Sequence, residues 1–429
     1  MQFSIFNFQF SISSTIILLI IFSLHLFLRF YDLENRTPFG WDQVDNVWAA
    51  KDIIVDHKIP LVGMQAKQNS GFYIGPLYYY FIAPFYWIFD LDPIASGVIS
   101  GVTSIFTFFT LFYIAKKLFS INVALMAVFL HTISFHIIDY DRIQWPINLI
   151  TPASLIIFYF LYQVVSGRVK YILALSVAIG FSFHLNFTSI FFPIIFLLTL
   201  PLFPRTKETV QYGLLAIPLF LAFLIPNLLY ELQSKAAASQ SLLNYITTYY
   251  HGIHLRRIIQ LAGDTFIEMS TLLMFKQLEF IKFLIFPLFC LVHTWKIHTK
   301  ERLALCYLLG LWFVVPWFVL SIYSGEITNY YFTMTRPIVI LIVAYLLVSL
   351  VRIPHLLPRL ALFGFLIYYA IVNVNKFLEP KYRPLSYHRR EVLKAIKEGR
   401  RIEFQQGIAQ SYIYYFYTTR RDVTRLKIE

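Results

Sequence analysis

The chain has 429 residues, of which 58% are hydrophobic and 14% are charged, and its mean hydropathy is +0.64. This balance excludes an ordinary soluble domain and predicts an all-α polytopic membrane protein. The net charge of +13 is typical of basic loops on the inner side of a membrane. No nucleic-acid-binding motif accompanies that charge, so no nucleic-acid partner is expected.

Apolar segments predict a bundle of about eleven transmembrane helices. The run from Tyr171 to Phe203 is too long for one helix, so it is divided at "FHLN" (Phe183–Asn186). Tyr78–Phe89 is short, contains Pro84 and is expected to lie at the interface or re-enter, without crossing. The predicted spans are Ile12–Phe30, Ile94–Ala115, Ile121–Ile138, Pro146–Val165, Tyr171–Phe183, Phe187–Phe203, Val210–Leu229, Glu279–Trp295, Leu303–Tyr323, Arg336–Val351 and Pro358–Val374.

Basic residues predict the orientation of this bundle. Every second loop between the predicted spans carries at least two basic residues. By the positive-inside rule, these loops and the N-terminus lie in the cytoplasm. The basic connections hold Lys116/Lys117, Arg168/Lys170, Arg205/Lys207, Lys296/Lys300/Arg302 and Arg352/Arg359. The predicted outer segments are 31–93, 139–145, 184–186, 230–278, 324–335 and the tail 375–429.

Two parts are expected: a membrane domain over 1–374 and a small outer segment over 375–429. In that tail, "SYHRREVLKAIKEG" predicts a short helix and "SYIYYFYTTRR" predicts a strand. The tail is too short to bury a core alone, so we expect it to pack on the outer face of the membrane domain.

Polar side chains that could carry chemistry gather on the predicted outer side. Ionisable groups at membrane depth are costly, and carboxylates, a histidine and arginines from separate loops suit an acid–base site for an anionic ligand. Structural roles stay open as well: helix caps, a local ion pair, an aromatic belt or snorkelling. The candidates are Asp42, Asp45, Lys67, Asp139, Asp141, Arg142, His184, Tyr330, Tyr331 and Arg336.

The order of several motifs resembles a known family. The acidic motif "WDQVDNVWAAKDI" is followed by "GPLYYYFIAP" (Gly75–Pro84), "AKKLFS" (Ala115–Ser120) and "DYDRIQWP" (Asp139–Pro146). This order resembles the GT-C glycosyltransferases, and more narrowly the group of dolichyl-phosphate-mannose–protein mannosyltransferases and lipid A aminoarabinose transferases. The resemblance is strongest over residues 10–205 and later rests on topology and "NYYFTMTRP".

The resemblance implies a polyprenyl-phosphate sugar donor and an inverting transfer on the non-cytoplasmic face. It places the general base at Asp42 by position. The family's second acid is replaced by Gln43, so Asp45 is a substitute candidate, and Asp141 is a further catalytic candidate. The family's lysine before "PPL" is absent, so Lys67 or an arginine would bind the phosphate.

The sugar transfer that the resemblance implies requires acidic, cationic and hydroxyl side chains of the kinds named above. A carboxylate can take the proton of an acceptor hydroxyl, and inversion needs one such base. The charge that develops on the lipid phosphate calls for cationic or hydroxyl donors. Those donors would be Arg142, His184, Tyr330, Tyr331, Arg336 and Lys67. No cofactor is required, although a divalent cation held by Asp42, Asp139, Asp141 and His184 stays open.

Other functions remain open from the sequence. A transporter or flippase of a lipid-linked saccharide, or a polysaccharide polymerase or ligase using a diphosphate carrier, would share the membrane class. The acceptor is a protein, a lipid or a glycan, and membrane lipids surround the chain. The membrane is the plasma or inner membrane in a prokaryote and the endoplasmic reticulum in a eukaryote.

Overall fold

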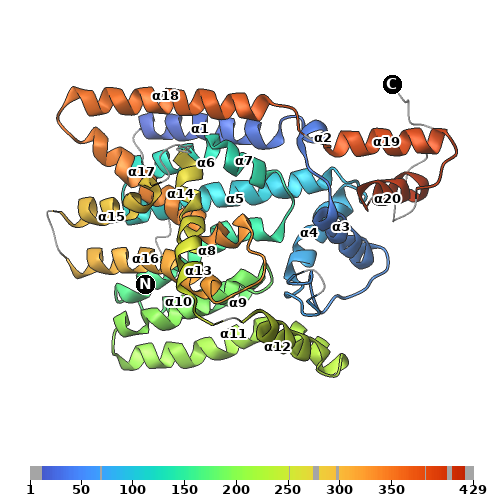
Figure 1. The fold of residues 1–429 in the computed structure, drawn as a ribbon, viewed down its shortest axis with the longest axis horizontal. Coiled ribbons are helices and arrows are strands. Elements are labelled where there is room, and N and C mark those ends of the chain that lie inside the picture. The colour runs from blue at the N-terminus through green and yellow to red at the C-terminus, as the bar shows by residue number, and fades with distance from the viewer. Residues whose placement is uncertain are drawn as a thin grey trace.

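The computed structural model describes residues 12–67, 70–250, 252–273, 280–295, 299–381, 383–402 and 408–420. These residues form helices joined by turns, with isolated bridges in place of strands. Most helices run side by side as a bundle, and a smaller cluster holding α3, α4, α19 and α20 lies at one end (Figure 1). Lys296, one of the basic residues used for the orientation, lies outside the described residues.

Within the described residues, seven helices are long and apolar enough to cross a membrane. Short 3₁₀ turns extend two of them, Pro146–Leu149 before α8 and Asn329–Thr335 before α17. The seven correspond to predicted spans. They are α1 (Ile12–Phe30), α5 (Ala95–Leu118), α8 (Ile150–Val165), α11 (Lys207–Gln233), α16 (Lys300–Ser321), α17 (Arg336–Val351) and α18 (Leu356–Leu378).

The span predicted over Ile121–Ile138 is not one straight helix. It consists of α6 (Ile121–Ile133) and α7 (Phe135–Asp141), which are bent by 70°. Asn373 of α18 explains the break, because its side-chain oxygen accepts the backbone N–H of Phe135 at 2.7 Å and satisfies the start of α7. The sequence contains no proline here, so periodicity alone could not reveal the bend.

The remaining predicted spans form shorter apolar helices. They are α9 (Tyr171–Ser182), α10 (Phe191–Thr199) with its flanking turns Phe187–Ile190 and Leu200–Leu202, and α15 (Ile281–Thr294). Because these helices are shorter than a full bilayer crossing, the total of eleven spans stays a prediction. The division at Phe183–Asn186 is confirmed, since α9 ends at Ser182 and the next turn begins at Phe187.

The outer segments are also helical. The segment 31–93 holds α2 (Leu33–Arg36), α3 (Trp41–Ile54) and α4 (Leu77–Ile88). Helix α4 covers the segment expected not to cross, and it packs along α3. The segment 230–278 holds α12 (Ala237–Tyr249), α13 (Leu255–Thr265) and α14 (Ile267–Leu273).

The tail contains two helices, α19 (Leu385–Lys397) and α20 (Ile408–Tyr415), the second continued by a π-helical turn over Phe416–Arg420. The strand expected over "SYIYYFYTTRR" is therefore wrong. Tyr412, Ile413 and Phe416 are buried at helical spacing, and no neighbouring strand in the described residues offers a ladder. The aromatic, β-branched composition suggested a strand, and tertiary packing overrode it.

The tail packs against the first outer segment. Arg389 of α19 forms ion pairs with Asp92 and, at 3.2 Å, with Glu34. The hydroxyl of Tyr412 donates to the carbonyl of Leu91 at 2.7 Å, and its ring lies edge-on to Trp48 of α3. These contacts fix α3 from the side away from the bundle.

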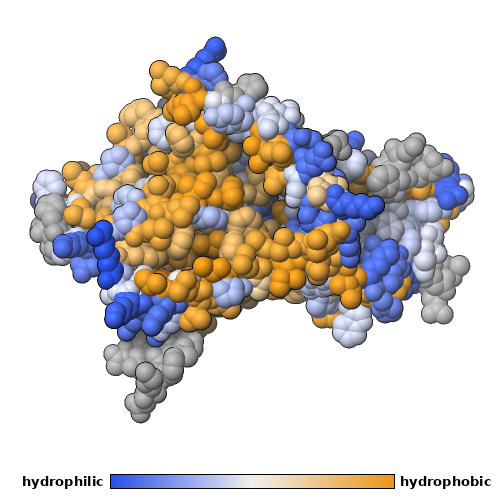
Figure 2. Space-filling model, turned by 90° about the horizontal axis from the view of Figure 1, so that it is seen from below, coloured by the Kyte–Doolittle hydropathy of each residue, from blue (hydrophilic) through white to orange (hydrophobic). Residues whose placement is uncertain are grey.

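Residues of alternate connections line different cavities, and the orientation of the bundle in the membrane stays a prediction. Ser120, Arg302 and Arg352, from three of the basic connections, line one cavity. Asp42, Asn186 and other residues of predicted outer segments line another. Figure 2 shows hydrophobic side chains over the middle of one face and hydrophilic ones toward both ends.

A buried ion pair joins α1 to α7. Arg29 is 0% exposed and donates to the Asp141 carboxylate at 2.8 and 3.1 Å. Ser104 of α5 donates to the same carboxylate oxygen at 2.6 Å. A buried charge without its partner is strongly destabilising.

We predict that Asp141→Asn lowers the free energy of unfolding by about 3–5 kcal/mol, since it leaves Arg29 charged and unpaired. Asp139→Asn is the matched control, because Asp139 pairs with Lys381 in a partly exposed position. The control is expected to cost less than about 1 kcal/mol. Thermal unfolding in detergent measures both, and equal effects would contradict the structural role of Asp141.

Candidate active site

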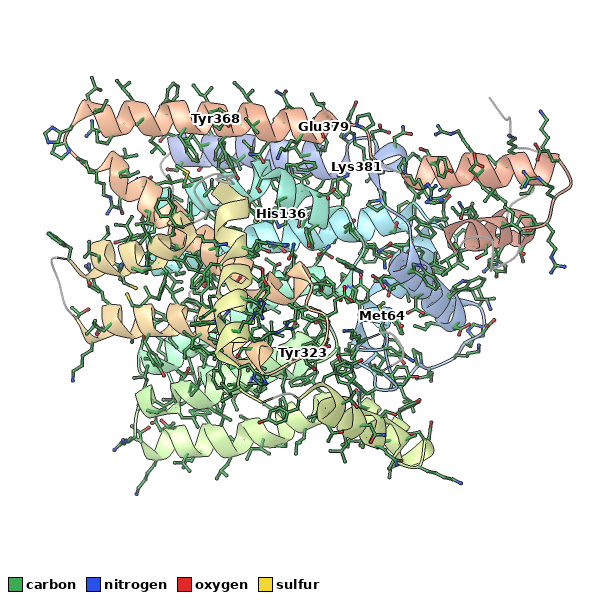
Figure 3. The ribbon with its side chains drawn as sticks, in the orientation of Figure 1. Met64, His136, Tyr323, Tyr368, Glu379 and Lys381 are labelled. Atoms are coloured by element: carbon green, nitrogen blue, oxygen red, sulfur yellow. The ribbon has the colours of Figure 1, made fainter. Side chains whose placement is uncertain are left out.

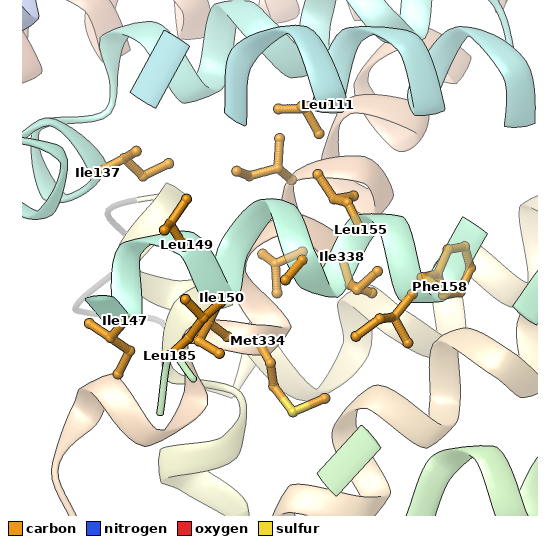
Figure 4. Close-up of a cluster of buried hydrophobic side chains, with 14 of the residues drawn as sticks. Leu111, Ile137, Ile147, Leu149, Ile150, Leu155, Phe158, Leu185, Met334 and Ile338 are labelled. Atoms are coloured by element: carbon orange, nitrogen blue, oxygen red, sulfur yellow. The ribbon is translucent and has the colours of Figure 1, made fainter. Parts of the chain in front are cut away.

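A cavity of about 300 Å³ lies where several of the predicted outer segments meet. The first outer segment contributes Asp42, Met64 and Lys67, and later segments contribute Trp145, Asn186, Glu326 and Tyr330. Met64 and Tyr323, both labelled in Figure 3, mark the two parts of the chain that approach each other here. Two of the wall residues, Ile147 and Leu185, also belong to the buried hydrophobic cluster in Figure 4, so the core forms one wall of the cavity.

Asp42 lies in the first turn of α3 and accepts a hydrogen bond from the indole N–H of Trp145. Burial raises the pKa of the Asp42 carboxyl above its ordinary value, and the Trp145 hydrogen bond opposes that rise. Partial removal from water increases the affinity of this carboxylate for a proton, and the hydrogen bond from Trp145 fixes its position.

Gln43, the residue that replaces the family's second acid, is buried behind Asp42. Its side-chain oxygen accepts the N–H of Gly40 at 2.9 Å, and its amide donates to the carbonyl of Gln144 at 2.9 Å. Tyr86 of α4 donates to the Gln144 side chain at 2.8 Å. The structure thus gives Gln43 a role that the sequence did not reveal: it holds the start of α3 against the 139–145 segment.

Asp45 lies one turn further along α3 and does not line the cavity. The hydroxyl of Tyr79 donates to its carboxylate at 3.1 Å, and the side chain is otherwise exposed. Asp42 and Asp45 therefore face different surroundings, although they share one helix.

Lys67 is the one cationic side chain among the described residues that line the cavity. Backbone hydrogen bonds pair Gly63 and Met64 with Ile74, and Ala66 with Phe72, which places Lys67 next to a short hairpin. Its ammonium group donates to the Tyr323 hydroxyl at 3.0 Å. The hydroxyl is a neutral partner, so the positive charge of Lys67 is not neutralised by this contact.

The two tyrosines of "NYYFTMTRP" have different positions. Tyr330 lines the cavity, with its ring 5.4 Å from that of Trp145. Tyr331 is buried behind it and packs edge-on to Phe187 at 5.0 Å. Tyr330 can therefore reach a ligand, and Tyr331 supports it.

The structure places Arg142 elsewhere. Its guanidinium donates to the carbonyls of Leu28 and Arg29 at 3.0 Å and of Tyr31 at 2.8 Å. These are carbonyls at the end of α1 that lack helical partners, so Arg142 caps that helix. It does not line the cavity.

Arg336 is likewise engaged outside the cavity. It forms a two-point ion pair with Glu268 of α14, at 2.9 and 3.1 Å, and lies over the ring of Tyr140. Sequence reasoning missed Glu268. The signal that could have found it is its isolation, as a lone carboxylate within the apolar stretch "TFIEMSTLL".

His184 makes its hydrogen bonds to the backbone. Its Nδ1 accepts the N–H of Leu77 at 3.4 Å, so Nε2 carries the proton and donates to the carbonyl of Phe223 at 2.9 Å. Burial lowers the pKa of His184, which agrees with this neutral form. It anchors the "GPL" turn to the end of α9, while its neighbours Leu185 and Asn186 line the cavity.

The four metal candidates are not brought together. Asp139 pairs with Lys381, Asp141 with Arg29, and His184 with backbone groups, which leaves Asp42 alone in the cavity. In the part of the chain that the structure describes, no group of three or more histidine, cysteine, aspartate or glutamate residues could hold a metal ion.

Known proteins resemble this chain in sequence over part of its length and in fold over nearly all of it. A family model of dolichyl-phosphate-mannose-protein mannosyltransferases matches residues 74–230. ArnT from Cupriavidus metallidurans, solved bound to undecaprenyl phosphate, has a TM-score of 0.58 at 11% identity, covering 94% of this chain and 75% of ArnT. Its apo state gives 0.59 at 14% identity, covering 94% and 74%.

A third structure is the archaeal oligosaccharyltransferase AglB from Archaeoglobus fulgidus, in complex with an inhibitory peptide and a dolichol-phosphate. Its TM-score is 0.56 at 11% identity, covering 97% of this chain, which spans 61% of AglB. A comparison with curated protein sequences found no match.

The structural likenesses cover nearly all of the chain and show its fold, and the family model adds a match in sequence over residues 74–230. The chain has the GT-C fold. The matched residues 74–230 include Trp145 and His184 but begin after Asp42 and Lys67. The roles of those two side chains therefore depend on the geometry of the cavity.

We predict that Gly75→Ala destabilises the protein, because the added Cβ would lie 1.8 Å from Nδ1 of the fixed His184 ring. Overpacking of this kind costs about 1–3 kcal/mol. Gly213→Ala in α11 is the control, since its Cβ would meet no atom within 4 Å. A melting temperature unchanged by Gly75→Ala would show that His184 does not anchor this turn.

Proposed function

We propose that this protein is a glycosyltransferase that moves a sugar from a polyprenyl-phosphate donor to an acceptor hydroxyl, with inversion at the anomeric carbon. The transfer takes place on the non-cytoplasmic face, and Asp42 is the general base. The observation that carries the proposal is a single cavity lined by both the Asp42 carboxylate and the Lys67 ammonium group.

The base function follows from the surroundings of Asp42. An acceptor hydroxyl is a weak nucleophile near neutral pH, so a positioned carboxylate must take its proton as the bond to the anomeric carbon forms. Asp42 is held by Trp145 and lies on a helix that Gln43 fastens from behind. A direct displacement needs no covalent intermediate, so one base is sufficient.

The leaving group would be bound by Lys67. When the bond from the sugar to the phosphate breaks, negative charge grows on the phosphate oxygens, and an ammonium group in a sheltered site stabilises that charge. The hydroxyl of Tyr330 and the side chain of Asn186 are further donors in the same cavity. This set replaces Arg142, His184 and Arg336, whose hydrogen bonds are used elsewhere.

Known relatives of the fold support this donor class. ArnT was solved with undecaprenyl phosphate and AglB with a dolichol-phosphate, and both are polyprenyl phosphates. The non-cytoplasmic face is supported by the position of the cavity, which lies at the end of the bundle opposite Ser120, Arg302 and Arg352. By the positive-inside rule, the end with the basic connections faces the cytoplasm.

We predict that Asp42→Asn reduces kcat for transfer by about 10²–10⁴-fold, the usual contribution of a general base. Asp45→Asn is the matched control, because Asp45 is the same residue type on the same helix but lies outside the cavity. The control is expected to keep kcat within about tenfold of the wild type, below the contribution of a base. Single-turnover transfer from a polyprenyl-phosphate sugar, followed by mass spectrometry of the acceptor, measures both.

Both variants should show the melting temperature of the wild-type protein, which separates loss of chemistry from loss of fold. Full activity of Asp42→Asn would falsify the assignment of the base. A large loss in Asp45→Asn alone would transfer the role to Asp45.

The Trp145 hydrogen bond gives a pH prediction. Because burial raises the pKa of Asp42, activity should fall with decreasing pH already above the ordinary aspartate range. Trp145→Phe removes the donor that lowers this pKa, so the acid limb of kcat/KM should move to higher pH. An acid limb that stays in place, or moves to lower pH, would show that Asp42 does not control it.

A further inference from the structure

A second polar cavity lies at the opposite end of the bundle from Asp42. Its volume is about 340 Å³, and it is lined by the ends of α5, α8, α15 and α17 together with the starts of α6 and α16. The end of α15, the start of α16 and the turn from α17 to α18 lie at this end, away from α3 (Figure 1). No step of the proposed transfer uses this cavity.

The lining of this cavity favours an anion. Arg302 and Arg352 supply two positive charges against one carboxylate, that of Glu301. Two long helices also begin here, α6 with Ser120 as its cap and α16 with Thr299 as its cap. Helix N-termini carry partial positive charge and unpaired N–H groups, so both add to the attraction for a negative ligand.

A buried histidine supplies independent support for a ligand. His293 is 8% exposed and lines the cavity. Its Nδ1 lies 3.2 Å from the hydroxyl of Tyr345, and its ring stacks on Phe289. The other ring nitrogen, Nε2, has no hydrogen-bond partner. Buried polar atoms are rarely left unpaired, and a bound phosphate oxygen would satisfy this one.

An apolar cavity of about 380 Å³ adjoins the polar one. The two share Val348 and Arg352. The apolar walls come from α1, α6, α17 and α18, among them Ile21, Met126, Val351 and Leu366. A charged compartment joined to an apolar one on a membrane-facing surface matches the head group and the acyl chain of one lipid.

We propose that the two cavities together bind one anionic phospholipid, with its phosphate between Arg302, Arg352 and His293 and an acyl chain along Met126. The side chains of the polar cavity could bind the phosphate group of any ligand. The adjoining apolar cavity selects the lipid, because free phosphate would leave that cavity without an occupant. The site is separate from the transfer cavity, so the proposal does not depend on the proposed function.

Native mass spectrometry of the full chain in detergent tests the proposal, with phosphatidylglycerol as the probe. The wild type is expected to bind one phosphatidylglycerol more tightly than diacylglycerol of the same chains, which lacks the phosphate. Arg352→Gln should weaken binding by about tenfold or more, the loss of one charge-assisted hydrogen bond. Arg359→Gln is the control, because Arg359 lies nearby on α18 but outside both cavities.

A second variant and a second ligand distinguish the lipid from free phosphate. Met126→Trp fills the apolar cavity, so it should weaken phosphatidylglycerol while leaving the binding of inorganic phosphate unchanged. Arg352→Gln should weaken both. Equal binding of diacylglycerol, or no difference between Arg352→Gln and Arg359→Gln, would overturn the site. Binding of inorganic phosphate alone, without phosphatidylglycerol, would overturn the assignment to a lipid.

Discussion

The ion pair between Arg29 and Asp141 is the contact on which the outer end of the bundle depends. Neither charge can be buried without the other, so the end of α1 and the end of α7 must meet. The residues that follow Asp141 then reach three separate elements: Arg142 caps α1, Gln144 binds α3 and α4, and Trp145 reaches Asp42. A short segment thereby sets the position of the proposed base.

Other contacts hold the cavity from outside this segment. The tail fastens α3 through Tyr412 and the α4–α5 turn through Arg389, and His184 fastens the "GPL" turn that precedes α4. Polar residues at the outer end therefore divide into two groups. Side chains of the first group form ion pairs or backbone hydrogen bonds that fix the helices. In the second group, Asp42 and Lys67 have only neutral hydrogen-bond partners, and both line the same cavity.

The sequence predicted the membrane class and the boundaries of most apolar helices, because hydropathy is a local signal, while the outer position of Asp42 stays a prediction. It did not predict which polar side chains partner one another. Arg142 and Arg336 have the residue type that binds phosphate, yet a helix end and Glu268 occupy them. The bend at Ser134 depends on Asn373, more than two hundred residues away. The tail helix depends on packing against α3, which composition does not encode.

The most direct test of the central claim is a structure with a polyprenyl-phosphonate sugar, a donor analogue that cannot transfer its sugar. The account predicts that the phosphonate oxygens lie within hydrogen-bond distance of the Lys67 ammonium group. It also predicts that the open face of the anomeric carbon points toward Asp42, with room for an acceptor hydroxyl between them. A phosphonate bound at Arg336 or Arg142, with the cavity at Asp42 unoccupied, would contradict it.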